Sequence, residues 1–276
     1  MLIDSHCHLT TEDFSDDLSE VISRAVSAGV GKIINIGTDI ETSKKCVKDA
    51  GKFGELYATV GLHPEEALED ENSDLKDIYN KLKEIAANDK VVAIGEIGLD
   101  YRWIEYVIES KNIKNPHKYA DSAIRKQRNV LESQLELALE LNLPVVIHSR
   151  EAETDLFELL KSFTENGGEG VLHSFTGDLG FMQYFVQRGW CVSYNGIITF
   201  KNADNVRLLC EKTPLESILL ETDAPFLSPV PYRGKRCEPA FLVETLKKLS
   251  EIKGFDEEEL ENLIEENTYK LFKKLG

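Results

Sequence analysis

Six residues of metal-binding types stand at or just beyond the ends of short apolar runs. They are His6, His8, Glu96, His148, His173 and Asp223. Imidazole nitrogen and carboxylate oxygen are the ligands that borderline and hard divalent cations take in proteins, and two such ions can share one bridging carboxylate. The residues therefore predict a hydrolase with two divalent metal ions (Mg, Mn or Zn) as cofactors.

The pair His6 and His8 is a weak signal by itself. Residues i and i+2 of a strand share a face, so two inward histidines also occur as hydrogen-bonded core. Polar clusters at strand ends can also serve stability alone. The whole set is harder to explain in that way, because the chain has only six histidines and four of them end apolar runs.

Eight apolar or β-branched runs precede or separate these residues and predict strands. They cover 2–3, 33–36, 57–60, 91–94, 145–147, 170–172, 191–194 and 218–220. Between them lie segments with helical period, clearest over 127–142, where Leu131, Leu135 and Ala138 share a face. Similar patterns occupy 16–28, 42–52, 73–87, 154–163, 179–188, 203–211 and 239–252, and a closing helix follows from 256.

Alternating strands and helices predict an α/β fold with a parallel sheet buried on both faces. Eight such units in 276 residues favour a (β/α)8 TIM barrel that forms one domain over residues 1–276. In this fold the carboxyl ends of the strands gather the catalytic groups, and every candidate ligand lies there. An open doubly wound sheet is the alternative, but it would splay ligands from five different strands too far apart.

Composition fits a globular enzyme, with 42% hydrophobic and 29% charged residues. No apolar run approaches the ~20 residues that cross a bilayer, and the amino terminus enters a strand at once, so we expect no signal peptide and no membrane contact. Five cysteines without a Cys-x-x-Cys motif fit a reducing compartment. We therefore expect a cytoplasmic protein, and nothing in the sequence indicates an obligate protein partner.

Several segments together resemble the TatD-type metal-dependent deoxyribonucleases, relatives of the amidohydrolases. The matching segments are 4–9 (DSHCHL), 61–64 (GLHP), 95–101 (GEIGLDY), 148–150 (HSR), 173–177 (HSFTG), 221–227 (ETDAPFL) and 232–236 (YRGKR). The resemblance implies that His6, His8 and Asp223 hold one ion. It implies that His148 and His173 hold the other and that Glu96 bridges the two. It further implies a nuclease, and we expect single-stranded DNA or DNA ends as substrate and exonuclease action.

Other residues are candidates for contact with the substrate. His63 follows the third strand and completes neither metal set, so it could bind phosphate or protonate the leaving oxygen; a loop histidine bonded to backbone is the alternative. Arg150, Arg233 and Arg236 carry the guanidinium fork that matches phosphate, although each could equally form a surface ion pair. Asp223 could also act as the general base that accepts the proton of water.

The sequence departs from the family pattern at two places. Residues 102–124 form a longer stretch than usual after the GLDY segment, which we expect to be a long loop serving as a lid, a partner surface or a plain insertion. Cys237 stands where the family often has Asn, in a loop expected near the metals.

Two other functions compete with the nuclease. A hydrolase of small-molecule ester, amide or phosphate bonds would be marked by a lysine at the end of the fourth strand, where this chain has Glu96. A barrel that binds without chemistry would be expected to lose the bridging carboxylate. The formal charge of −17 argues against a general basic groove for nucleic acid.

Overall fold

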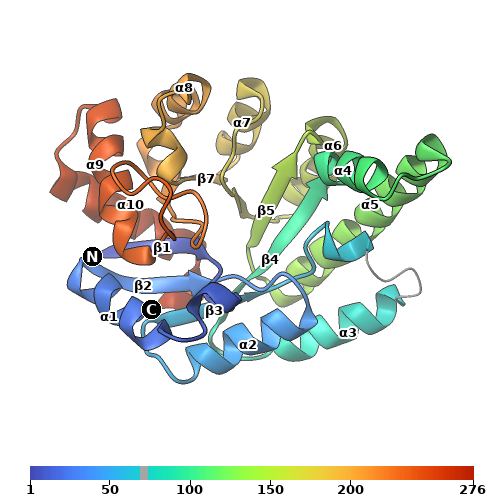
Figure 1. Ribbon diagram of the computed structural model, residues 1–276, viewed down its shortest axis with the longest axis horizontal. Coiled ribbons are helices and arrows are strands. Elements are labelled where there is room, and N and C mark those ends of the chain that lie inside the picture. Colours follow the sequence, from blue (N-terminus) through green and yellow to red (C-terminus); the bar gives the residue numbers. More distant parts are fainter. Residues whose placement is uncertain (69–73) are drawn as a thin grey trace.

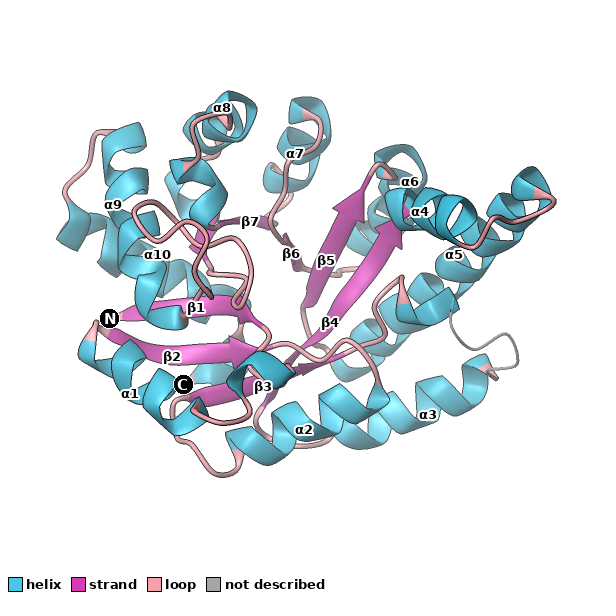
Figure 2. Cartoon of the chain, viewed as in Figure 1, coloured by secondary structure: helices cyan, strands magenta, loops and turns pink. Residues whose placement is uncertain are grey.

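The barrel expected from the sequence is confirmed in the computed structural model, which describes residues 1–68 and 74–276. In these ranges eight parallel strands form one sheet in the order β1 to β8, each paired with the next. They are β1 Leu2–Cys7, β2 Val30–Asn35, β3 Leu56–Val60, β4 Val91–Asp100, β5 Val145–Arg150, β6 Gly170–Leu172, β7 Cys191–Tyr194 and β8 Ile218–Leu220. The strands form a nearly closed (β/α)8 barrel with helices around it (Figures 1 and 2).

Contacts between the segment after β8 and the end of β1 complete the ring. Asp223 N donates to His6 O at 2.9 Å, and His8 N donates to Ala224 O at 2.7 Å. The carboxylate of Asp4 accepts hydrogen bonds from Thr222 N at 2.9 Å and from Thr222 Oγ1 at 2.5 Å. These bonds fix the two segments that carry three of the predicted ligands.

The predicted helices are present, with small changes at their ends except for α5, which begins earlier than expected. The described helices are α1 Leu18–Ser27, α2 Ile40–Ala50, α3 Leu75–Ala86, α4 Tyr101–Ser110, α5 Pro116–Leu141, α6 Glu153–Glu165, α7 Leu179–Val186, α8 Asp204–Lys212, α9 Leu242–Lys253 and α10 Glu257–Leu271. The pattern expected from residue 73 begins outside the described residues, and the one expected from 239 opens as a 3-10 turn before α9. None of the described helices has the length and apolarity needed to cross a bilayer.

The long loop expected over 102–124 is wrong, because this stretch is mostly helical. It contains α4 and the first turns of α5, which begins at Pro116 rather than near residue 127. Asp100 caps α4 by accepting a hydrogen bond from Trp103 N at 2.7 Å, and proline is favoured in the first turn of a helix such as α5. Ile104 of α4 is buried, so the two helices pack as a hairpin.

Candidate metal centre

Four of the predicted ligands converge at the mouth of the barrel. Nε2 of His6 lies 3.4 Å from Glu96 Oε2 and 3.7 Å from Asp223 Oδ1. Nε2 of His8 lies 3.3 Å from the same Asp223 oxygen and 3.2 Å from Nε2 of His6. Ligand atoms that share one tetrahedral ion at ~2.1 Å stand about 3.4 Å from one another. The spacing of this first cluster therefore suits one divalent ion.

The other oxygen of Glu96 faces a second group of histidines. Oε1 lies 2.9 Å from Nδ1 of His148, 3.6 Å from Nε2 of His63 and 3.7 Å from Nε2 of His173. The rings of His173 and His6 stack with their centroids 3.5 Å apart, so the two clusters adjoin. Glu96 is thus placed as a carboxylate between two sets of imidazoles.

Local backbone features allow this convergence. Gly98 of β4 has a φ of +155°, and a Cβ at that position would lie 1.9 Å from the carbonyl oxygen of His148. Only glycine lets β4 approach β5 so closely beside Glu96. Asp223 adopts a φ of 59° in the left-handed region, a strained conformation for a residue with a side chain. The bond from its N–H to His6 O holds it there.

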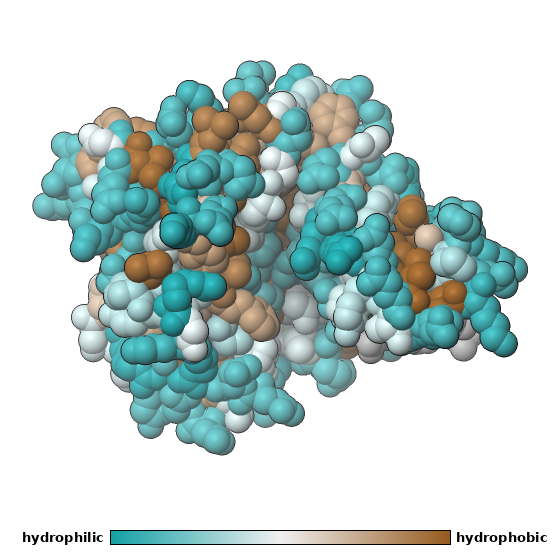
Figure 3. All heavy atoms as spheres, turned by 45° about the horizontal axis from the view of Figure 1, so that its top comes forward, coloured by the Kyte–Doolittle hydropathy of each residue, from teal (hydrophilic) through white to brown (hydrophobic). Residues whose placement is uncertain are grey.

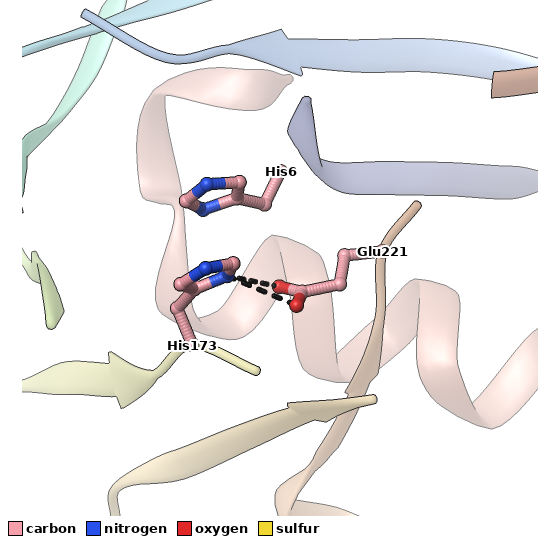
Figure 4. A group of neighbouring side chains, drawn as sticks. All are labelled: His6, His173 and Glu221. Atoms are coloured by element: carbon pink, nitrogen blue, oxygen red, sulfur yellow. Dashed lines mark hydrogen bonds and ion pairs between the residues drawn. The ribbon is translucent and has the colours of Figure 1, made fainter. Parts of the chain in front are cut away.

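Two carboxylates outside the predicted site residues fix His148 and His173, which are called the second cluster from here on. Asp100 Oδ2 lies 3.0 Å from Nε2 of His148, and both oxygens of Glu221 lie 2.9 Å from Nδ1 of His173 (Figure 4). A carboxylate on the outer nitrogen of a ligating histidine sets its tautomer and orientation. Strand alternation could have indicated Asp100, because it stands four residues after Glu96 and therefore faces the same way.

The carboxylates and imidazoles of the site shift one another's ionisation. Burial opposes ionisation of Glu96, but the nearby imidazoles outweigh it and hold the pKa of this carboxyl well below its usual range. Burial also disfavours the charged imidazoles, yet Asp100 and Glu96 raise the pKa of His148 to about 9. Glu221 and Glu96 likewise raise the pKa of His173 to about 10. In the metal-free protein, protons therefore occupy sites that cations can take over.

The donor set fits divalent metal. Glu96 and His6 are 3% and 1% exposed, so the negative charge of the carboxylate is removed from water and needs nearby positive charge. Nitrogen and carboxylate ligands of this kind bind zinc, manganese or magnesium. His6, His8, Asp223 and Oε2 of Glu96 would hold one ion. Around Oε1 the ligand atoms of Glu96, His148 and His63 lie within 4.8 Å of one another, and the predicted set of His148, His173 and Glu96 for a second ion stays a prediction.

His63 lies at the same mouth but differs from the ligands. Burial lowers the pKa of His63 to about 3, so the ring is neutral at physiological pH. Its Nδ1 accepts a hydrogen bond from Glu65 N at 3.3 Å, which leaves the ring proton on Nε2. A neutral ring with its proton on Nε2 can donate to an acceptor at the mouth of the barrel, where this nitrogen lies 3.6 Å from Glu96 Oε1.

The three arginines predicted to contact phosphate lie outside these clusters. Arg150 ends β5 and is exposed beside its partner in register, Asp100. The guanidinium of Arg233 lies 3.8 Å from the ring centroid of Phe200. Arg236 pairs with Asp17 at 2.7 Å. The contact of each arginine with phosphate stays a prediction.

Comparison with known proteins gives relatives along the whole length of the chain. The family described as TatD related DNase matches residues 3–273. The uncharacterized metal-dependent hydrolase YabD of Bacillus subtilis is 36% identical, with 99% of each chain covered. The 3'-5' ssDNA/RNA exonuclease TatD of Citrobacter rodentium is 32% identical, with 98% of this chain and 97% of that protein covered. The crystal structure of YjjV, a TatD homologue from Escherichia coli, is 33% identical, covers 99% of this chain and 98% of its own, and has a TM-score of 0.84.

Proposed function

This chain belongs to the family of TatD-related DNases and is a metal-dependent hydrolase, and from that premise we propose that it cleaves phosphodiester bonds of single-stranded nucleic acid. One observation carries the proposal. The carboxylate of Glu96 presents one oxygen to His6 and the other to His148, which is the arrangement that a bridging ligand of two ions requires. The exonuclease name of a relative supports the choice of a nucleic acid.

The residues of the site have separate roles in this reaction. Divalent ions at the two clusters would lower the pKa of water toward ~7 and stabilise the charge that grows on phosphoryl oxygens. Asp223 is ionised, since the hydrogen bond from His8 and the imidazoles outweigh burial and lower its pKa. It can therefore accept the proton of the attacking water. His63 donates its Nε2–H to a phosphate oxygen and so orients the substrate.

The outer carboxylates support the ligands rather than the substrate. Asp100 holds His148, and Glu221 holds His173. Glu221 is itself fixed by hydrogen bonds from Ser193 Oγ at 2.5 Å and from Asn195 Nδ2 at 3.0 Å. These buried bonds preorganise the second cluster, and preorganisation lowers the cost of reaching the reactive geometry. Arg150, at the end of β5, is the arginine that we propose for a further phosphate contact.

A metal-depletion experiment tests this function. The metal-free protein is assayed on labelled single-stranded DNA, single-stranded RNA and bis(p-nitrophenyl) phosphate, with Mg²⁺, Mn²⁺ or Zn²⁺ added back in turn. We expect hydrolysis of a single strand, progressing from one end, only after metal is restored. Adding p-nitrophenyl acetate and a p-nitroanilide as further substrates tests the alternative. Restored protein that cleaves either of these but no phosphodiester would overturn the proposal and favour a small-molecule hydrolase.

A further inference from the structure

The formal charge of the chain hides a basic segment beside the metal centre. Residues 102–128 contain seven Lys or Arg and three Asp or Glu, a formal charge of +4, whereas the rest of the chain carries −21. These residues form α4 and the first half of α5. At physiological salt, charges beyond about 8 Å are largely screened. A polyanion on this hairpin would therefore respond to its local positive charge more than to the acidic remainder.

The hairpin begins where the metal centre ends. β4 finishes at Asp100, whose carboxylate contacts His148 through one oxygen and accepts from Trp103 N through the other. The carboxylate of Asp100 therefore connects the first turn of α4 directly to His148, a predicted metal ligand. Figure 1 shows α4 beside the arrowheads of β4 and β5, with the far end of α5 projecting beyond the barrel.

Cations on this hairpin divide into paired and unpaired sets. Arg102 pairs with Glu105 at 2.7 Å, and Arg128 pairs with Asp155 at 2.8 Å. Four others are exposed and have no ion pair in ranges 1–68 and 74–276: Lys111, Lys114, Lys118 and Arg125. They lie in the turn between the helices and on the solvent side of α5. Unpaired exposed cations are available to phosphate groups without breaking an existing salt bridge.

An aromatic pair lies on α4 between the metal centre and these cations. The rings of Trp103 and Tyr106 stack with centroids 5.0 Å apart and an interplanar angle of 28°, and Tyr106 is 53% exposed. Trp103 is half-buried, so the pair presents mainly the ring of Tyr106 to solvent. Nucleic-acid bases stack on such rings in a sequence-tolerant way. The face drawn in Figure 3 is largely hydrophilic and is hollowed near its middle.

We propose that the α4–α5 hairpin is a binding arm for single-stranded nucleic acid. A base next to the scissile phosphate stacks on Tyr106 and Trp103, and the following phosphates contact the four unpaired cations. This inference rests on the proposed function, because it assigns the strand that leads into the metal centre. Each neutralised phosphate of a single strand steepens the salt dependence of log affinity by about 0.7, so four contacts contribute about −3 to the slope.

A charge-neutralised variant tests the arm with a matched control. The four substitutions are Lys111→Gln, Lys114→Gln, Lys118→Gln and Arg125→Gln. The control removes the same charge from four lysines on other elements that are exposed and form no ion pair with the described part of the chain: Lys48→Gln, Lys247→Gln, Lys270→Gln and Lys274→Gln. Metal-loaded proteins are titrated with dye-labelled phosphorothioate single strands of 3, 10 and 20 nucleotides over a salt series, with DNA and RNA in parallel arms. Thermal melting checks that each protein is folded.

For the hairpin variant we expect the Kd of the 20-nucleotide strand to rise at least about tenfold and the salt slope to fall by about 3. The control should keep the wild-type slope. Equal slopes in the two variants would overturn the inference. So would a wild-type Kd that does not improve between 3 and 20 nucleotides. Tighter binding of RNA or of DNA by the wild-type protein would identify the preferred type of strand, and either result is compatible with the binding arm.

A second variant tests the stacking contact separately from charge. Tyr106→Ser should raise the Kd of the 10-nucleotide strand about 5- to 100-fold, as loss of one stacked base predicts. Phe255→Ser is the control, because Phe255 is 45% exposed in the turn between α9 and α10. Hydrolysis of bis(p-nitrophenyl) phosphate by the wild-type protein tests the proposed function independently. The wild-type protein could cleave that ester while Tyr106→Ser and the charge variant bind single strands as the wild type does. That result would refute the binding arm and still support the proposed hydrolase function.

Discussion

Asp100 lies 3.0 Å from Nε2 of His148, on the side of the imidazole opposite Glu96. An ionised carboxylate only accepts hydrogen bonds, so in the neutral ring it holds the proton on Nε2 and leaves the electron pair of Nδ1 directed at Glu96. This relationship makes His148 ready to bind an ion. Asp100, which lies outside the predicted ligand set, thus orients one of the predicted ligands.

Replacing Asp100 by Asn tests that relationship. The amide oxygen can still cap α4, but the NH₂ group donates to Nε2 of His148 and moves the ring proton to Nδ1, where an ion would bind. We expect metal affinity of the second cluster to fall about 10- to 100-fold with little change in thermal stability. Asp155→Asn, which alters a carboxylate bonded to Tyr101 and Arg128, is the control. Titration against a competing chelator decides, and two ions bound as tightly as in the wild type would contradict the assignment.

The proposed role of Glu96 as a bridge predicts a difference between two ligand deletions. Glu96→Ala should abolish turnover and empty both clusters, because its two oxygens face both sets of histidines. His148→Ala should empty mainly the second cluster. Native mass spectrometry gives the number of bound ions for each protein. A Glu96→Ala protein that keeps two ions and full activity would refute the two-metal site.

Much of this fold could be predicted because the predicted ligands stand directly after the apolar runs that form strands. Several apolar runs that form strands are followed at once by a polar residue such as His148 or His173, and closure of the barrel brings these ends together. The orienting role of Glu221 could not be predicted in that way, since it depends on which ring nitrogen it meets in space. The α4–α5 hairpin is hard to predict for another reason. Its buried apolar positions, such as Ile104 and Ala123, belong to α4 and α5, which contact each other, and polar residues dominate the stretch between them.

The neutral state of His63 predicts loss of activity without loss of metal. Its Nδ1 accepts a hydrogen bond from Glu65 N, so its proton lies on Nε2, from which we propose that it donates to a phosphate oxygen. His63→Ala should retain both ions and lose roughly 10²-fold or more in turnover of a phosphodiester. Metal content and single-strand hydrolysis are measured on the same sample. A mutant that turns over like the wild type would make His63 a structural loop histidine, and one that loses an ion would make it a ligand.

The bond between Asp4 and Thr222 predicts a stability effect at the junction of β1 and β8. Thr222→Val removes the hydroxyl that donates to Asp4, which is fully buried, and leaves an acceptor short of a partner. We expect a loss of about 1–3 kcal/mol in the free energy of unfolding. Thr245→Val is a matched control, because Thr245 is 1% exposed and its hydroxyl has no hydrogen bond in the described structure. Denaturant melts that show equal losses for both variants would exclude a special role for the Asp4 bond.

The raised pKa values of His148 and His173 predict that metal binding releases protons. Burial disfavours the charged rings, but the adjacent carboxylates raise the pKa to about 9 for His148 and to about 10 for His173, so both are protonated at pH 7 without metal. An ion must displace one proton from each ring. The apparent affinity of the second cluster for metal should therefore rise with pH, by up to about a hundredfold per pH unit below pH 9, and level off above pH 10.

In the metal-free protein, the contribution of these two histidines to the free energy of unfolding should change with pH in the opposite direction. A folded-state pKa raised above the unfolded value of about 6.5 stabilises the fold below that pH, and the contribution is lost as pH rises through 9 to 10.

Calorimetric titration of the metal-free protein with metal, in buffers of different ionisation enthalpy, counts the protons that binding releases. We expect about two protons to be released at pH 7. Release of none would show that the two rings are neutral before the ion arrives.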